Sequence, residues 1–193
     1  METILYFIRH GETDWNKLRR IQGHSDIELN SLGEEQAERL AAHIANHPIT
    51  AVYSSDLKRA RCTAQKLADL VGVPLQTLET LRERNYGEWE GLTMEEIQTQ
   101  FSYLATDLTV YGIEAFEAMQ KRAHQCLSDL ALNHPNQTIA AVSHGGLINA
   151  FLHYVTLGEQ GTGITRIDNT GTSVFRYRGG FWEVVSINAI DHL

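Results

Sequence analysis

The sequence predicts an α/β protein with three layers, α/β/α, around a mostly parallel central sheet. Short apolar runs, such as 4–8, 50–53 and 138–142, alternate with longer segments whose apolar residues recur at helical spacing. This alternation is typical of parallel sheets, because each crossover between parallel strands passes through a helix. The 193 residues contain no internal repeat and no linker-like tract, so we expect one domain that spans residues 1–193.

The first half of the chain supplies two strand–helix units. After the first strand, a helix is expected to follow the Asn30-Ser31 cap region, where Ser31 and Glu34 have the spacing of a capping box. The second strand leads into another helix, which is expected to end at Gly72, and residues 75–78 would add a short strand. The inward faces comprise Ala37, Leu40, Ala41 and Ile44 in the first helix, and Ala60, Ala64, Leu67 and Val71 in the second.

The middle of the chain is expected to leave the sheet. Residues 81–93 are loop-like, and the segment 93–114 would form a short helical lid that begins at a Thr93–Glu96 cap. A long amphipathic helix is then predicted over 116–130. The strand at 138–142 follows, and a further helix opens near Leu147.

The C-terminal part has a different pattern. Residues 173–177 and 181–187 alternate between apolar and polar and flank Gly179-Gly180. Two such runs around a glycine turn predict an antiparallel hairpin at the edge of the sheet.

The composition is that of a globular protein with excess negative charge. Hydrophobic residues make up 42% of the chain and charged residues 21%, and the formal net charge is −8 with a pI of about 5.5. This balance argues against nucleic-acid and membrane-surface binding, which both need a basic face. It still allows a small anionic substrate, because a local cluster of arginines can bind phosphate on an acidic protein.

The cysteines and the hydropathy of the chain indicate its cellular compartment. Cys62 and Cys126 fall at inward-facing positions of predicted helices, so we expect two buried thiols in a reducing compartment. The first apolar run is too short for a signal peptide, and no run approaches about 20 apolar residues, the length of a membrane span. We therefore expect a cytoplasmic protein that makes no membrane contact. Its oligomeric state, a homodimer included, stays open.

Two apolar strands end at a histidine followed by glycine. The first ends in Arg9-His10-Gly11, and the later one in Ser143-His144-Gly145-Gly146. Because sites in open α/β sheets form at the carboxyl edge of parallel strands, His10 and His144 are expected to lie over one pocket. Two imidazoles beside the arginine at position 9 suit a phosphoryl group.

These residues and their order resemble the histidine phosphatase superfamily, also called the phosphoglycerate-mutase-like family. Further blocks keep the family order over nearly the whole chain. They are Arg9-His10-Gly11-Glu12-Thr13-Asp14-Trp15-Asn16, Gln22-Gly23, Ser55-Asp56-Leu57-Lys58-Arg59-Ala60 with Thr63-Ala64, Leu81-Arg82-Glu83, Gly87-Glu88-Trp89-Glu90-Gly91, and Ser143-His144-Gly145-Gly146. The chain looks most like the bacterial broad-specificity and α-ribazole phosphatases.

The resemblance implies roles for the matched residues. His10 would attack phosphorus and form phosphohistidine, and Glu83 would act as general acid. The acids Glu12, Glu79, Glu88 and Glu90 stay open as alternatives to Glu83. The phosphoryl oxygens would be held by Arg9, Asn16, Arg59 and a charged His144. The second contacts to substrate would come from Thr13, Gln22, Gly23, Tyr86 and the Gly145 backbone.

The same resemblance implies metal-free chemistry, because so much positive charge is built into the site. Neither a metal nor another cofactor is expected. A zinc site is the competing interpretation of several histidines, but His43 and His47, which have i,i+4 spacing, lack a third ligand nearby.

The expected activity is hydrolysis of a small organic phosphomonoester. A phosphoglycerate-type mutase and a non-catalytic phosphoester-binding module are the alternatives. The short lid favours hydrolysis, because a mutase must keep water away from phosphohistidine. Residues 101–116 contain no lysine or arginine, and where many relatives have Gly-Glu-Ser this chain has Ile113-Glu114-Ala115. The apolar residues of the lid suit a substrate with an organic body, or else pack the helix ends; they are Tyr103, Leu104, Leu108, Val110, Tyr111 and Ile113.

Overall fold

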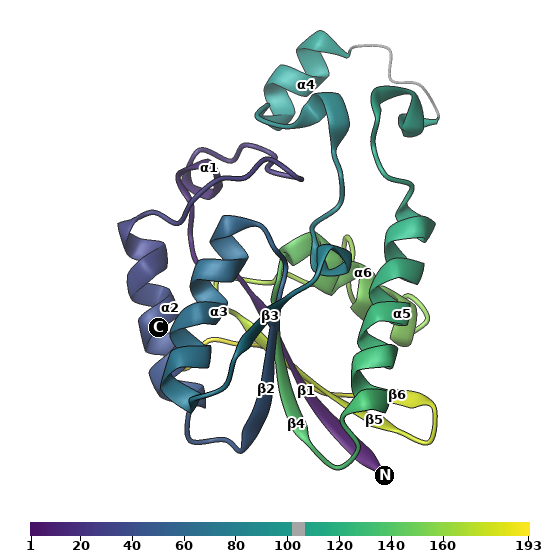
Figure 1. Cartoon of the computed structure of the whole chain (residues 1–193). Helices are drawn as coiled ribbons and strands as arrows, with labels where there is room; N and C mark the ends of the chain where they lie inside the picture. Colours follow the sequence, from purple (N-terminus) through teal and green to yellow (C-terminus); the bar gives the residue numbers. More distant parts are fainter. Residues whose placement is uncertain (102–106) are drawn as a thin grey trace.

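The computed structural model describes residues 1–101 and 107–193. Its centre is a sheet in the order β3-β2-β4-β1-β5-β6, with helices packed on both faces (Figure 1). The strands are β1 Glu2–Arg9, β2 Ile49–Ser54, β3 Leu75–Thr77, β4 Thr138–Ser143, β5 Thr172–Arg178 and β6 Phe181–Ala189. The helices are α1 Asp14–Lys17, α2 Ser31–Ile44, α3 Lys58–Val71, α4 Met94–Gln100, α5 Phe116–Asn133 and α6 Gly145–Val155. Short 3₁₀ turns lie at Glu79–Leu81, Gly87–Trp89 and Leu108–Tyr111.

The strand directions confirm the predicted mixed sheet. Strands β1, β4, β2 and β3 run parallel, whereas β5 pairs antiparallel with β1 and β6 pairs antiparallel with β5. Helices α2 and α3 cover one face, and α5 and α6 cover the other (Figure 1). The three-layer arrangement therefore has its hairpin at one edge, as expected.

Two apolar clusters hold the layers together. On the α5–α6 face, the rings of Phe7, Phe151 and Phe175 contact one another edge to face. On the other face, Leu40 of α2 and Leu67 of α3 pack against the sheet, and both are fully buried. Each such side chain stabilises the fold by about 1.5–3 kcal/mol. The clusters on the two faces therefore hold the strands, and the residues at their ends, in fixed positions.

The helix caps agree in part with the sequence. Gly72 ends α3 in the left-handed region (φ 72°), and Thr93 and Glu96 form the expected capping box. The predicted box at Ser31 and Glu34 is wrong: the cap is Asn30, whose side-chain oxygen accepts from the amide of Gly33 at 2.9 Å. Asparagine is among the best N-caps, so the helix begins one residue earlier than the Ser31 spacing indicates.

One cysteine also departs from expectation. Cys126 is buried, but Cys62 is exposed on α3. The inward face of α3 is formed by residues such as Ala60 and Ala64, and a residue two positions beyond Ala60 points to the opposite side of a helix. Among the described residues, no helix is both long and apolar enough to span a membrane.

Of the segment 93–114, residues 93–101 and 107–114 lie above the carboxyl edge of the sheet, at the top of Figure 1. Tyr103 and Leu104 fall outside the described residues. Leu108, Tyr111 and Ile113 join a separate apolar cluster with Trp89 and Ile97. Of the two interpretations of this apolar segment, packing therefore accounts for these three side chains. The role of the segment as a lid stays a prediction.

Candidate active site

The structure brings His10 and His144 together. Strands β1 and β4 are neighbours, with Arg9 opposite Ser143 in the parallel register, so each histidine lies one residue beyond the paired end of its strand. Their ring centroids are 5.2 Å apart and the rings meet edge-on. This is the juxtaposition that the two strand-end histidines predict.

A polar cavity of about 270 Å³ opens over these strand ends. It is lined by the predicted site residues Arg9, His10, Asn16, Gln22, Gly23, Arg59, Glu83, Tyr86 and Gly145, and by Arg20, Gly146, Asn149 and Ile167. Two predicted residues, Thr13 and His144, are buried behind this lining. Most of the predicted residues thus converge on one small space.

The ring of His10 is held in one orientation. Its Nδ1 lies 2.7 Å from the carbonyl oxygen of Gly11, so Nδ1 donates and Nε2 keeps its lone pair. Gly11 packs so closely against the backbone of Gly33 that a Cβ at position 11 would clash. The carbonyl of His10 in turn accepts from Asn169 Nδ2 at 3.1 Å and from the amide of Thr170 at 3.2 Å.

Electrostatics keep this ring neutral. Burial, with the nearby Arg59 and Arg9 adding to it, places the pKa of His10 well below its usual value of 6.5. A neutral imidazole with its lone pair on Nε2 is a usable nucleophile at neutral pH.

Two buried arginines give the cavity its positive charge. Arg9 donates through Nη1 to the carbonyl of Ile167, and Arg59 donates to the carbonyls of Ser25 and Gly23 at 2.7 Å each. The Nε atoms of both arginines are buried with no hydrogen-bond partner among the described residues. Burial lowers the pKa of both guanidinium groups, that of Arg59 to about 10. Buried cations of this kind are stabilised by a bound anion.

His144 differs from the expectation that it is charged. Its ring is fully buried, and neither ring nitrogen has a hydrogen-bond partner among the described residues. Burial, followed by the neighbouring Arg59, His10 and Arg9, lowers its pKa well below 6.5. With only the protein's own groups around it, His144 is therefore neutral. A phosphoryl dianion between the arginines would offset this repulsion and raise its pKa.

Asn16 presents its amide hydrogens to the cavity. Its Oδ1 accepts from the backbone and hydroxyl of Thr13, at 3.1 Å each, and from Asn169 Nδ2 at 3.3 Å. Because the oxygen is occupied, Nδ2 is left as the donor. Thr13 is the N-cap of α1, so the structure gives it a role in orienting Asn16, whereas the substrate contact expected for it stays a prediction.

Glu83 is the one carboxylate among the described residues that line the cavity. Its Oε1 accepts from the amide of Arg84 at 2.8 Å, and its Oε2 from the amide of Gly146 at 2.9 Å.

The other acids that the sequence leaves open lie outside the cavity lining. Glu88 is exposed on a 3₁₀ turn, and the remaining three bind other partners. Glu90 accepts from the amide of His24 and the hydroxyl of Ser25, Glu12 accepts from the side chain of Asn30, and Glu79 pairs with Arg82 at 3.4 Å. The geometry therefore favours Glu83.

Sequence reasoning missed Arg20, Asn149 and Ile167 in the lining, and Asn169 behind it. Arg20 forms an ion pair with Glu96 at 2.9 Å. Asn149 lies on α6, and its Nδ2 donates to a backbone carbonyl while Oδ1 is buried with no partner among the described residues. Only its position one turn after Gly145 and Gly146 signals that Asn149 faces the site.

Comparison with known proteins identifies the family. The family model described as "Histidine phosphatase superfamily (branch 1)" matches residues 5–190. The chain belongs to this superfamily. That result confirms the resemblance in the strand-end motifs, whereas the finer likeness to α-ribazole phosphatases stays a prediction.

Two similar sequences and one similar solved structure are named as mutase-like or phosphatase proteins. "Phosphoglycerate mutase-like protein 4" of Arabidopsis thaliana is 36% identical, over 96% of this chain and 85% of its own. "Metal-independent phosphoserine phosphatase" of the same plant is 32% identical, over 99% and 83%. A mutant phosphoserine phosphatase from Entamoeba histolytica, solved in complex with phosphoserine, is 33% identical with a TM-score of 0.84 and covers 99% of both chains.

Proposed function

We propose that this chain hydrolyses small phosphomonoesters through a phosphohistidine on His10, with Glu83 as general acid and base. The observation that carries the proposal is the His10 ring, whose Nδ1 is held as a donor by Gly11 so that Nε2 is free to act as nucleophile. That the enzyme is a phosphatase of small organic phosphates agrees with its family and with the names of its relatives.

In the first step, Nε2 of His10 forms a bond to phosphorus while the bond from phosphorus to the alcohol oxygen breaks. The leaving oxygen takes a proton from Glu83. In the second step, water attacks phosphorus, Glu83 takes up the proton, and the bond between phosphorus and Nε2 breaks to release phosphate. Each turnover therefore returns to Glu83 the proton that it gave to the leaving oxygen.

The phosphoryl oxygens would be held by Arg9, Arg59, Asn16 and His144. Preorganised donors of this kind stabilise the transition state because they need no reorganisation during the reaction. Gln22, Gly23, Tyr86 and Gly145 also line the cavity, and we propose that they contact the substrate around the phosphate. A cavity of about 270 Å³ fits a small organic body.

We propose that neither a metal nor another cofactor takes part. The two buried arginines already supply the charge that a divalent cation would bring, and they would repel one. The histidines with i,i+4 spacing contact different neighbours: His43 lies beside His192, with ring centroids 5.8 Å apart, and His47 lies beside Tyr6 at 5.2 Å.

A phosphoglycerate-type mutase is the alternative, and it is favoured by the relative named mutase-like. A mutase must also bind a second anionic group of its substrate. The additional cations near the cavity, however, have partners already: Arg20 pairs with Glu96, and Arg84 donates through Nε to the carbonyl of Glu114 at 2.7 Å. This arrangement supports hydrolysis. For the location we propose the cytoplasm, in line with two free thiols.

Trapping the covalent intermediate tests the proposal. Rapid acid-free quenching of the enzyme with a ³²P-labelled phosphomonoester should leave base-stable, acid-labile label on His10. The variant His10→Ala should show neither label nor turnover, whereas His153→Ala, a histidine outside the cavity lining, should retain both. Full turnover by His10→Ala would refute the nucleophile and the mechanism built on it.

A further inference from the structure

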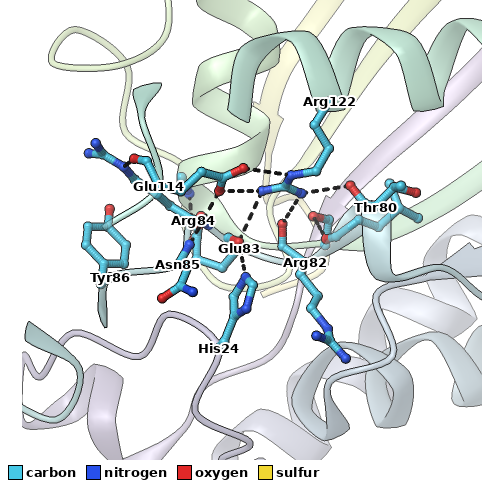
Figure 2. A network of polar contacts seen from close by, with 12 residues as sticks. His24, Thr80, Arg82, Glu83, Arg84, Asn85, Tyr86, Glu114 and Arg122 are labelled. Atoms are coloured by element: carbon cyan, nitrogen blue, oxygen red, sulfur yellow. Dashed lines mark hydrogen bonds and ion pairs between the residues drawn. The ribbon is translucent and has the colours of Figure 1, made fainter. Parts of the chain in front are cut away.

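Arg122, on the second turn of α5, faces the loop that carries Glu83. Figure 2 shows its guanidinium group between the loop backbone and the side chain of Glu114. The side chains of Arg122 and Glu114 are 21% and 19% exposed. This pair lies outside the lining of the catalytic cavity, so the proposed chemistry leaves its role unexplained.

The contacts of Arg122 use the whole guanidinium group. Its Nη1 donates to the carbonyls of Thr80 and Arg82, at 2.8 Å each, and its Nη2 donates to the carbonyl of Glu83 at 3.3 Å. Nη2 and Nε also bind the carboxylate of Glu114, at 2.8 and 3.0 Å. A guanidinium group has five N–H donors in a rigid fork. One side chain thus ties three carbonyls of a short loop to a single carboxylate (Figure 2).

Glu114 anchors the same loop from its own backbone. Its amide donates to the carbonyl of Asn85 at 2.8 Å, and its carbonyl accepts from Nε of Arg84 at 2.7 Å. The pair therefore holds the loop through both side chain and main chain. A bidentate arginine–carboxylate pair with limited exposure is among the stronger charged contacts. Glu114 thus contacts Arg122 and the loop. It lies in Ile113-Glu114-Ala115, where many relatives have Gly-Glu-Ser.

A second group fixes the loop from the opposite side. Nε2 of His24 donates to the carbonyl of Glu83 at 2.9 Å (Figure 2). The backbone of Glu83 is thus held by His24 and Arg122 together, while its carboxylate is held by the amides of Arg84 and Gly146. The direction in which the carboxylate points depends on both sets of contacts.

We propose that Arg122, braced by Glu114, is a positioning residue that fixes the loop from Thr80 to Asn85 so that the Glu83 carboxylate faces the reacting phosphoester. This inference rests on the proposed role of Glu83 as general acid. A displacement of about 1 Å in a catalytic group can cost about 100-fold in rate. Loss of the Arg122 contacts should therefore weaken proton delivery, while the phosphate-binding Arg9 and Arg59 keep their positions.

The test compares two substrates that differ in their need for a proton. Glycerol phosphate has a poor leaving group, whereas p-nitrophenolate leaves with little protonation. Arg122→Met should lower kcat/KM for glycerol phosphate by about tenfold or more, and change kcat/KM for p-nitrophenyl phosphate far less. Inhibition by vanadate should be unchanged, because it reports the phosphate-binding groups. In a Glu83→Gln background the same change should have almost no further effect, since the group that it positions is gone.

Two further variants distinguish a loss of positioning from a general loss of folding. Arg122→Lys keeps the charge, but one ammonium group cannot bridge three carbonyls and a carboxylate, so it should give the same substrate pattern with a smaller loss. Lys121→Met removes an exposed charge from the neighbouring position of α5 and should leave both substrates unaffected. If Arg122→Met does not fold, Arg122→Lys carries the test.

The outcomes separate this inference from the function on which it rests. Equal losses on both substrates, weaker vanadate inhibition, or an effect that adds to that of Glu83→Gln would overturn the positioning role of Arg122. So would a silent Arg122→Met beside a strongly impaired Glu83→Gln, which would leave the proposed function intact. Near-normal turnover of glycerol phosphate by Glu83→Gln itself would remove the general acid and this inference with it, while the proposed phosphohistidine on His10 would stand.

Discussion

The carboxylate of Glu83 accepts a hydrogen bond from the amide of Gly146 at 2.9 Å, so the proposed acid is fixed to the first turn of α6. That helix begins directly after His144, which is its N-cap residue. The proposed acid and one histidine of the site are thereby held by the same helix start. The positions of the proposed acid and of His144 are therefore set by the same structural element.

A methyl group at position 146 should disturb this contact. A Cβ on Gly146 would overlap Oε1 of Glu83 and lie only 3.0 Å from Oε2. Gly146→Ala should therefore displace the carboxylate and lower kcat/KM for alkyl phosphates by about 100-fold. Because alanine is a better helix former than glycine, thermal stability should not fall by a comparable amount. Paired activity and melting measurements on the variant would check this.

Gly145→Ala is the matched control. A Cβ there would lie 3.4 Å from Nε of Arg9 and away from Glu83. Any loss should therefore appear in vanadate binding and be similar for alkyl and p-nitrophenyl phosphates. If Gly146→Ala keeps wild-type activity on alkyl phosphates, the close approach of Gly146 and Glu83 has no role in proton delivery.

Strand-end patterns were sufficient to predict the centre of this site. An apolar run that stops at His-Gly specifies both a strand and the edge where its histidine lies, so the amino-acid sequence alone was enough to pair His10 with His144. The capping role of Thr13 could not be predicted, because a capping threonine and a substrate-binding threonine look alike in a sequence. Asn169 and Arg122 act through contacts 159 and 39–42 positions away in the chain, and no local spacing signals such contacts.

Protonation of the two buried histidines should lower the free energy of unfolding as the pH is lowered. His10 and His144 have pKa values well below 6.5 in the folded chain, whereas in the unfolded chain they titrate near 6.5. Below about pH 6.5 the unfolded state therefore binds more protons, and each histidine lowers the free energy of unfolding by up to about 1.4 kcal/mol per pH unit. This contribution is fully present above the unfolded pKa and is lost as the pH falls towards the folded one.

Urea unfolding between about pH 5.5 and 7.5 in phosphate-free buffer would measure this slope. His144→Gln removes one titrating group from the site and should reduce the slope, and the double variant with His10→Gln should reduce it further. Partly buried His124 and His192, whose pKa values are also lowered by burial, contribute equally to all three proteins. Identical slopes in the wild type and the double variant would show that the site histidines are not buried as neutral groups.

Chelation should leave turnover unchanged. The phosphoryl charge would be balanced by Arg9 and Arg59, so activity on p-nitrophenyl phosphate should survive prolonged dialysis against EDTA. Vanadate, which adopts the five-coordinate geometry of phosphoryl transfer, should inhibit in competition with substrate. Activity lost to EDTA and restored by zinc or magnesium would contradict the proposed chemistry.

Hydrolysis should prevail over isomerisation of phosphoglycerates. The phosphohistidine can pass its phosphoryl group either to water or to a second alcohol, and the second route requires cations that hold the far end of a bisphosphorylated ligand. Arg20 and Arg84, the additional cations near the cavity, are engaged by Glu96 and by the carbonyl of Glu114. With 3-phosphoglycerate and a bisphosphoglycerate primer, phosphorus NMR should therefore show release of inorganic phosphate faster than formation of 2-phosphoglycerate.

Glu96→Gln is the matched variant. It removes the counter-charge of Arg20, so the ratio of products should shift towards isomerisation if that arginine can reach the ligand. Isomerisation that exceeds phosphate release in the wild type would make the chain a mutase, with the same nucleophile and the same acid.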